Sequence, residues 1–300
     1  MTRCTTERLA AAERFIWLTA RVLEQRRFEH LHADGSAAAV RTALEAYRCA
    51  DGGFGYGLEP DARGPVSQPL QAWTALMILD EIGQCTGAAA HEICDYLAGI
   101  TRPDGGVPAG DVRLAGYPHA PWMPAAEEPE GSLLSTALLA GVLHQNRIEH
   151  PWLAGADEFC WSVIDSRTET HPYEARAAVA FLDRVPQRER AAAAAERFGE
   201  MIREAGYVLL DPDHPERANV APGYASGEVP GPCEYAPEPT SLARAWFSDE
   251  EMARGLDDLA AQQQDDGGWP ISWLEWAPGT ALEGRPKVTL DALRTLHAYD

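Results

Sequence analysis

The stretch Gln262-Gln263-Gln264-Asp265-Asp266-Gly267-Gly268-Trp269 indicates the end of a polar helix, a turn made by two glycines, and a tryptophan directly after it. The same Asp-Gly-Gly-apolar turn recurs as Asp51-Gly52-Gly53-Phe54 and as Asp104-Gly105-Gly106-Val107. The first two copies start 53 residues apart, and the third starts 162 residues after the second, about three times that interval. This spacing predicts a repeated unit of two helices, a turn and a loop.

Composition excludes several classes of function. The 300 residues are 45% hydrophobic, as in a folded globular protein, and carry a net charge of −21. That charge argues against a nucleic-acid partner and against an anionic membrane surface, because both require clustered lysine and arginine. The six cysteines include no C-x-x-C pair, and no stretch resembles a signal peptide or a membrane span. We therefore expect a cytoplasmic protein with reduced thiols.

Hydrophobic periodicity predicts an all-α chain. The expected helices cover 7–30, 36–50, 68–83, 88–101, 132–146, 151–166, 172–185, 187–206, 240–247, 249–264 and 289–299. Pro69 fits a first helical turn, Gly83 a C-terminal cap, and Thr289 a helix start, while Ser248 and Glu251 form a capping box. Helices that follow long loops are apolar nearly all round, and helices that precede the glycine turns are more polar. This alternation predicts an inner and an outer ring of helices.

Loop lengths alternate along the chain as well. The segments 55–67, 107–130, 208–239 and 270–288 are long and hold most of the 22 prolines, whereas the intervening connections are short. In an up-and-down arrangement, alternate connections lie on the same rim, so the long loops are expected to share one rim and to form the walls of a pocket. No linker divides the chain, which predicts a single domain over 1–300.

One motif resembles a known family. Gln263-x-x-x-Gly267-x-Trp269 is similar to the glutamine–tryptophan repeat of squalene–hopene and oxidosqualene cyclases. The Asp-Gly-Gly-Phe turn resembles turns of protein prenyltransferase β subunits. Both families belong to the terpenoid cyclase/prenyltransferase superfamily, so the resemblance implies an α/α toroid of about six helical hairpins in one domain. The earlier copies depart from the motif, with Arg48 and Thr101 in place of the glutamine. The motif is structural in that family, so it implies a fold more than an activity.

The resemblance also suggests where an acid would lie. A type II cyclase protonates an alkene or an epoxide with one carboxylic acid that faces aromatic side chains. The family's Asp-x-Asp-Asp motif is absent, and its nearest parallels are Glu59-Pro60-Asp61 and Asp211-Pro212-Asp213. The second is ordinary turn chemistry. Glu59 and Asp61 are therefore the candidate catalytic residues. The alternatives are a solvated acid, or an acid that orders the loop by pairing with Arg63.

Aromatic and charged residues of the long loops are candidates for substrate binding. They are Tyr56, Arg63, Tyr117, His119, Trp122, Tyr235, Trp269, Trp273, Trp276, Glu283 and Arg285. Their alternative role is to pack the loops against themselves.

A prenyltransferase-like zinc site is not expected. Cys233 and His297 are far apart in the sequence, and no neighbouring acid reproduces the family's ligand spacing. His91 and Cys94 fall on a helix expected to lie outside. We expect neither a metal nor another cofactor.

Three functions remain open. The first is a cyclase-like or prenyltransferase-like enzyme acting on an apolar, isoprenoid-type small molecule. The second is a carbohydrate-active enzyme with paired carboxylates, which would set Glu59 and Asp61 opposite Glu234, Glu238 or Glu275. The third is a non-catalytic ligand-binding toroid. The sequence favours an enzyme and gives no oligomeric state.

Overall fold

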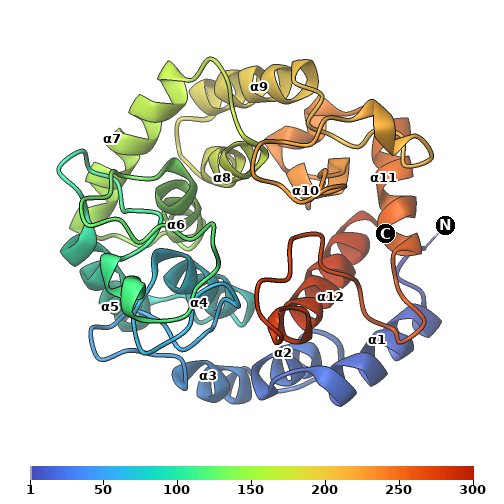
Figure 1. Ribbon diagram of the computed structural model, residues 1–300, viewed down its shortest axis with the longest axis horizontal. Coiled ribbons are helices and arrows are strands. Elements are labelled where there is room, and N and C mark those ends of the chain that lie inside the picture. The colour runs from blue at the N-terminus through green and yellow to red at the C-terminus, as the bar shows by residue number, and fades with distance from the viewer. Residues whose placement is uncertain (1) are drawn as a thin grey trace. The chain divides into compact units, whose positions relative to one another are not determined.

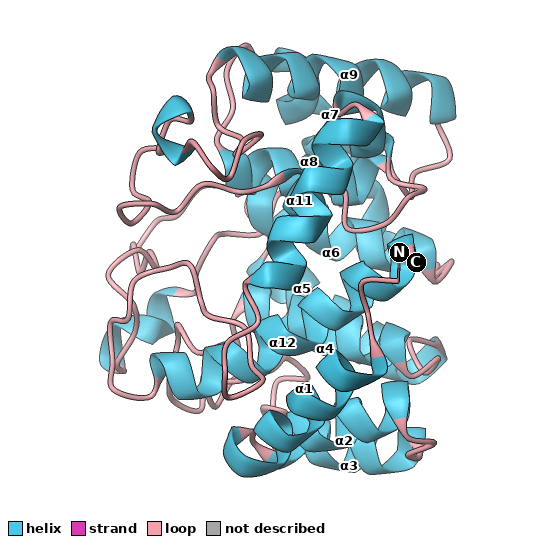
Figure 2. Ribbon diagram, turned by 90° about the vertical axis from the view of Figure 1, so that its right-hand side faces the viewer, coloured by secondary structure: helices cyan, strands magenta, loops and turns pink. Residues whose placement is uncertain are grey.

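The computed structural model describes residues 2–300, which form helices and loops and contain no β-strand (Figure 2). The α-helices are α1 (Thr6–Thr19), α2 (Val22–His32), α3 (Ala37–Glu45), α4 (Pro69–Glu81), α5 (Gly87–Ile100), α6 (Leu133–Gln145), α7 (Pro151–Ser166), α8 (Pro172–Leu182), α9 (Arg188–Glu204), α10 (Pro232–Tyr235), α11 (Asp249–Ala261) and α12 (Thr280–Tyr299). Three short 3₁₀ segments are η1 (Val112–Gly116), η2 (Pro215–Arg217) and η3 (Leu242–Trp246). The all-α prediction is confirmed.

The chain divides into two compact units. Unit 1 contains the described residues up to Ser36 together with Glu169–Arg176 and Ala195–Asp300, and unit 2 contains Ala37–Thr168 and Ala177–Ala194. Helices α8 and α9 each contribute residues to both units. The single domain over 1–300 therefore stays a prediction.

In unit 2, α4 and α6 pack against each other, and each also contacts an amphipathic neighbour, α5 or α7 (Figure 1). Most side chains of α4 and α6 are buried, as their apolar composition predicts. Pro69 occupies the start of α4, and Gly83 follows its end with φ of 64°. The expected pairing of buried and amphipathic helices is therefore present in this unit.

In unit 1, α12 contacts α1, α2 and α11. Its buried face carries Leu290, Leu293 and Leu296. The two ends of the chain meet, because the backbone amides of Arg3 and Cys4 donate to the Asp300 carboxylate at 2.7 and 2.8 Å (Figure 1).

Four predicted helices differ from the structure. The helix expected over 36–50 ends at Glu45, and the one expected over 240–247 is the 3₁₀ segment η3. The helix expected over 7–30 is broken at Ala20 and Arg21, which are extended, and no glycine or proline marks the break. The helix expected to start at Thr289 starts at Thr280 and contains Pro286. The Thr289 hydroxyl instead accepts a hydrogen bond of 3.0 Å from the Trp269 amide. A proline normally marks a helix boundary, which explains the late predicted start.

The three Asp-Gly-Gly turns have one geometry. In each, the amide of the second glycine donates to Oδ1 of the aspartate, at 3.2 Å for Asp51, 3.0 Å for Asp104 and 3.0 Å for Asp266. The first glycine of each copy has a positive φ, between 85° and 97°. These backbone angles require glycine, and the aspartate closes the turn as an Asx turn.

Each turn also docks on a helix in the same way. A Cβ added to the first glycine would lie 2.9 Å from the Glu92 carbonyl, 3.0 Å from the Gly155 carbonyl or 2.1 Å from the Ala11 carbonyl. Four residues after these three carbonyls come Tyr96, Phe159 and Phe15, and each ring lies against the second glycine of its turn. The repeat therefore includes a receiving helix with an aromatic residue at a constant offset, a feature that the sequence pattern did not predict.

Gln263 and Trp269 hold the third turn in place. The Gln263 amide donates to the Gly267 carbonyl at 2.8 Å and to the Arg8 carbonyl of α1 at 3.0 Å. The Trp269 indole is fully buried and donates to the Leu259 carbonyl of α11 at 2.7 Å. This turn thus ties α11 to α1.

Three helices end in the same Schellman-type turn. After α4 and α9, the residues with positive φ are Gly83 and Gly206, and after α6 the residue is Arg147, with φ of 54°. The Arg147 amide donates to the His144 carbonyl and the Ile148 amide to the Leu143 carbonyl, both at 3.0 Å. Arginine therefore occupies a backbone conformation that glycine fills in the two equivalent turns.

We expect Arg147→Gly to stabilise the protein by about 1 kcal/mol, because the left-handed conformation is unfavourable for a residue with a Cβ. Urea unfolding followed by circular dichroism measures the change. Arg254→Gly inside α11 is the matched control, and it should lower stability by about 1 kcal/mol. A loss of stability in Arg147→Gly would contradict the expectation.

Candidate functional site

The loop 55–67, which carries Glu59 and Asp61, is joined to the loop 107–130 by backbone hydrogen bonds within unit 2. Ala62 and His119 form an isolated antiparallel bridge. The Ala120 amide donates to the Asp61 carbonyl at 2.8 Å, and the Arg63 amide donates to the Pro118 carbonyl at 3.0 Å. Candidate residues from both loops are therefore brought together.

Asp61 is oriented by an aromatic side chain. Its Oδ2 accepts a hydrogen bond of 2.9 Å from the indole N–H of Trp122, whose ring is 40% exposed. Glu59 lies nearby in sequence, and its Oε1 accepts a hydrogen bond from the hydroxyl of Thr74 in α4. The buried Gln71 accepts from the Leu58 amide at 2.9 Å and donates to the Ala62 carbonyl at 3.2 Å. Helix α4 thus holds the loop that presents both carboxyl groups.

Two tyrosines complete this group. Tyr56 has a φ of 57° and a side chain that is 52% exposed. The ring of Tyr117 lies against Gly64, where an added Cβ would come within 2.5 Å of it. The loops therefore present exposed aromatic rings and carboxyl groups on one part of unit 2. Such a combination can protonate a substrate and stabilise positive charge on it.

A polar network that the sequence analysis did not predict supports these loops. Asp111 is buried, and both its oxygens accept hydrogen bonds from the Arg113 guanidinium, at 3.0 and 2.8 Å. Asp51 of the first glycine turn accepts from the Ser67 hydroxyl at 2.5 Å and from Arg113 at 3.3 Å. The hydrogen bonds to Asp111 raise the pKa of Arg113, so the guanidinium stays charged. Nothing in the local pattern marks Asp111 as buried.

The remaining candidates belong to unit 1. Glu283 lies 3.7 Å from the Arg21 guanidinium, which also binds the buried Glu24. Trp273 lies against Gly284 of α12. Trp276 is partly exposed. Glu283 and the two tryptophans thus have surface from which to contact a ligand.

Three other candidates from unit 1 are part of its packed structure. Trp269 is fully buried, as described above. Tyr235 is 1% exposed, and its hydroxyl donates to the Tyr207 carbonyl at 2.6 Å. Arg285 binds both oxygens of Asp266 at 2.8 and 2.7 Å, and this pairing lowers the pKa of Asp266. These contacts give all three side chains a structural role.

Unit 1 also contains an aromatic group that the sequence analysis missed. The rings of His171, Tyr173 and Tyr224 lie with centroids 4.9 to 5.7 Å apart. The buried Glu228 accepts from the Tyr173 hydroxyl at 3.2 Å and from the Ala225 amide at 2.8 Å. These two hydrogen bonds hold the loop 221–231, which carries Glu228 and Tyr224, against Tyr173 of α8.

The two alternative site types are a metal site and a pair of carboxylates for carbohydrate cleavage. Within residues 2–300, no three His, Cys, Asp or Glu side chains are placed to share a metal ion. Cys233 is buried beside Met252. The carboxylate pairs of a carbohydrate enzyme would combine Glu59 or Asp61 of unit 2 with acids of unit 1, so they remain predictions. None of the described helices has the length and apolarity to cross a bilayer.

Comparison with known proteins identifies the fold. No protein-family model and no curated protein matches the sequence. Among solved structures, a protein from Actinoplanes is 19% identical, with a TM-score of 0.54 over 97% of this chain and 89% of that one. A variant of the type II terpene cyclase MstE from Scytonema, in complex with its substrate geranylgeranyl dihydroxybenzoate, is 13% identical, with a TM-score of 0.51 over 96% and 86%. Ligand-free MstE is 12% identical, with a TM-score of 0.51 over 97% and 87%.

These likenesses place the chain in the all-α class of α/α toroids, the fold of type II terpene cyclases. The resemblance stated from Gln263, Gly267 and Trp269 is confirmed at the level of the fold. At these identities the comparison shows the fold alone, and the activity has to be argued from the side chains of the site.

Proposed function

We propose that the protein is a terpene-cyclase-like enzyme that acts on a small, apolar, isoprenoid-type substrate. The observation that carries this proposal is the hydrogen bond of 2.9 Å between the Asp61 carboxyl group and the indole of Trp122, a side chain that is 40% exposed. The shared fold with a cyclase of known substrate supports it. No metal or other cofactor is needed for the reaction proposed.

The proposed reaction begins with proton transfer from Asp61 to a terminal carbon–carbon double bond. The remaining double bonds then attack the cation in turn, and loss of a proton from the last cation restores a neutral product. The product is an isomer of the substrate, so atoms and charge balance. Tyr56, Tyr117 and Trp122 would stabilise the cations with their ring faces. Glu59, on the same loop, is the second candidate for the acid.

The test uses geranylgeranyl dihydroxybenzoate and geranylgeraniol as substrates in D₂O, with products analysed by mass spectrometry. A cyclase of this type gives an isomer that has gained one deuterium, because the acid exchanges its proton with solvent. Asp61→Asn should lower the rate by about 10³-fold, and Glu250→Gln, an exposed carboxyl of α11, should leave it unchanged.

Two results would change the proposal. Loss of turnover in Glu59→Gln but not in Asp61→Asn would transfer the acid role to Glu59. Failure of both prenyl compounds to react or to raise the unfolding temperature, together with stabilisation by oligosaccharides, would reject the cyclase in favour of the carbohydrate-active enzyme.

A further inference from the structure

The start of α4 carries three buried polar side chains in an otherwise apolar helix. Gln71 and Thr74 lie within the helix and Gln68 directly before it, so the three recur at every third residue. Their exposed fractions are 1%, 6% and 0%. A buried amide lowers stability unless it is hydrogen-bonded, so the partners of these side chains show what they do.

Gln71 binds the backbone of the loop 55–67 at two points. Its amide oxygen accepts a hydrogen bond of 2.9 Å from the Leu58 amide, and its amide nitrogen donates to the Ala62 carbonyl at 3.2 Å. The Leu58 amide also lies 3.1 Å from the Gly55 carbonyl, whereas the Ala62 carbonyl receives no other hydrogen bond from residues 2–300. Leu58 and Ala62 flank the stretch that carries both candidate acids. Gln71 therefore holds this stretch at its two ends.

Ala62 is the point at which α4 and both loops meet. On either side of it, the Asp61 carbonyl and the Arg63 amide bond to the loop 107–130, at 2.8 and 3.0 Å. The carbonyl of Ala62 itself bonds to Gln71, and Ala62 is 1% exposed. Successive residues of an extended segment present their backbone groups to opposite sides. Gln71 thus fixes one side of this segment to a helix, while the loop 107–130 pairs with the other side.

The hydrogen bond of 2.9 Å between Trp122 and Asp61 crosses from one loop to the other. Because the Trp122 side chain is 40% exposed, water competes for its indole N–H, and the bond persists only while the two loops keep their register. We propose that Gln71 is a positioning residue for the proposed acid: by holding Ala62, it sets where Asp61 meets Trp122. The effect on the reaction rate rests on the proposed function, whereas the effect on this hydrogen bond does not.

Gln71→Met tests the proposal, because it keeps the length of the side chain and removes both hydrogen bonds. The indole N–H signal of Trp122 in a nitrogen–proton correlation NMR spectrum reports the bond to Asp61, and Trp122→Phe identifies that signal among the nine tryptophans. We expect Gln71→Met to move the signal to its position in Asp61→Ala, in which the bond cannot form. We also expect kcat for a prenyl substrate to fall about 100-fold with little change in KM, since a misplacement of about 1 Å has an effect of this size.

Gln71→Glu is the conservative variant, and it adds a pH test. An ionised glutamate can accept from the Leu58 amide but cannot donate to the Ala62 carbonyl, whereas a protonated one can do both. Because burial disfavours the charged form, the new carboxyl group gains its proton as the pH falls. At low pH the Trp122 signal of this variant should therefore approach its position in the unmodified protein at the same pH. This recovery decides the question even if Gln71→Met does not fold.

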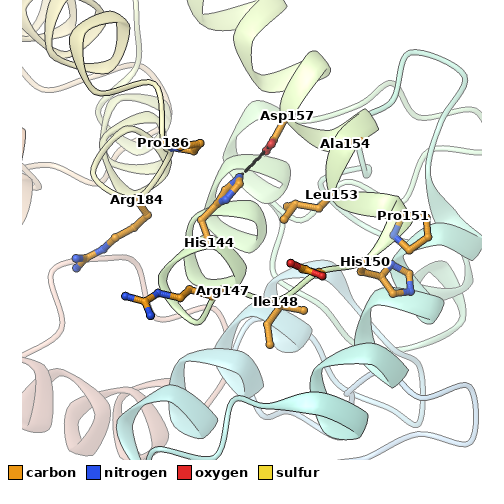
Figure 3. A pocket seen from close by; sticks show the side chains of 11 residues that line it. His144, Arg147, Ile148, His150, Pro151, Leu153, Ala154, Asp157, Arg184 and Pro186 are labelled. Carbon is orange, nitrogen blue, oxygen red and sulfur yellow. Dashed lines mark hydrogen bonds and ion pairs between the residues drawn. The ribbon is translucent and has the colours of Figure 1, made fainter.

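Gln145→Met is the matched control in the same unit. Gln145 is exposed at the end of α6, directly after His144, which lines a groove away from these loops (Figure 3). Its side chain donates to Asp80, near the opposite end of α4 from Gln71, at 2.9 Å. Both the Trp122 signal and kcat should be unchanged in this variant.

The proposal is overturned if Gln71→Met leaves the Trp122 signal where it lies in the unmodified protein, or if the signal moves and kcat does not fall. It is also overturned if the signal of Gln71→Glu does not change with pH relative to the unmodified protein. If no prenyl compound reacts with the unmodified protein, the proposed function fails, and the Trp122 signal alone decides whether Gln71 holds the hydrogen bond in place.

Discussion

We expect Gly267→Ala to destabilise the protein by about 4 kcal/mol, from backbone strain together with overpacking. Gly267 has a φ of 97°, and an added Cβ would lie 2.1 Å from the carbonyl oxygen of Ala11. The added Cβ is fixed to the backbone of the turn and would meet backbone atoms of Ala11 in α1, so no side-chain rotation can relieve the clash. Urea unfolding followed by circular dichroism measures the loss.

Gly83→Ala is the matched control for that prediction. Gly83 also has a positive φ, of 64°, but an added Cβ would have no neighbour within 4 Å. Gly83→Ala should therefore lose stability only through backbone strain, by about 1 kcal/mol. Equal losses in the two variants would show that the close approach to Ala11 contributes nothing and would contradict the docking role of the turn.

The local part of this fold could be predicted from the sequence. Two adjacent glycines after an aspartate specify a turn of one geometry, and the 53-residue interval reveals that it repeats. The docking partner could not be predicted in the same way. Glu92 lies 40 residues after Gly52 and Gly155 lies 50 after Gly105, whereas Ala11 lies near the opposite end of the chain from Gly267. No constant spacing links a turn to its helix.

The predicted helix boundaries are wrong where the local sequence does not indicate the observed structure. Between α1 and α2, Ala20 and Arg21 are good helix formers, yet both are extended. After the break the Arg21 guanidinium binds Glu24, three residues further along the chain, and it also lies 3.7 Å from Glu283 of α12, which is a tertiary contact. In α12, Pro286 lies inside the helix, although proline is strongly unfavourable there. Tertiary context therefore decided both cases.

The candidate site was predictable in part. The sequence placed Asp61 and Trp122 on two long loops, and the structure joins them by a hydrogen bond. It could not separate exposed aromatic residues from packed ones, because Trp269 and Trp122 both follow loop signals. Their exposures are 0% and 40%. The long loops are expected to form the walls of a pocket, but residues 280–288 belong to α12, and Thr280, Gly284 and Pro286 are buried in unit 1.

Trp269 gives the second large effect. Trp269→Ala should destabilise the protein by about 4 kcal/mol, since it removes a large, fully buried ring. Trp269→Phe should have a smaller effect, about 1.5 kcal/mol, because it keeps most of the ring but leaves the Leu259 carbonyl without its indole donor at 2.7 Å. Trp17→Ala, at a ring that is 44% exposed, is the control and should change stability by less than about 1 kcal/mol.

The two Trp269 variants also separate structure from substrate binding. If Trp269 only supports the turn, Trp269→Phe will reduce stability and leave the KM for a prenyl substrate unchanged, because a buried ring has no surface to offer. If the ring contacts substrate, KM will rise even under conditions where the variant is fully folded. The first result would confine the binding residues of this loop to those beyond Trp269, whose side chains are partly exposed, and the second would return Trp269 to the set predicted from the sequence.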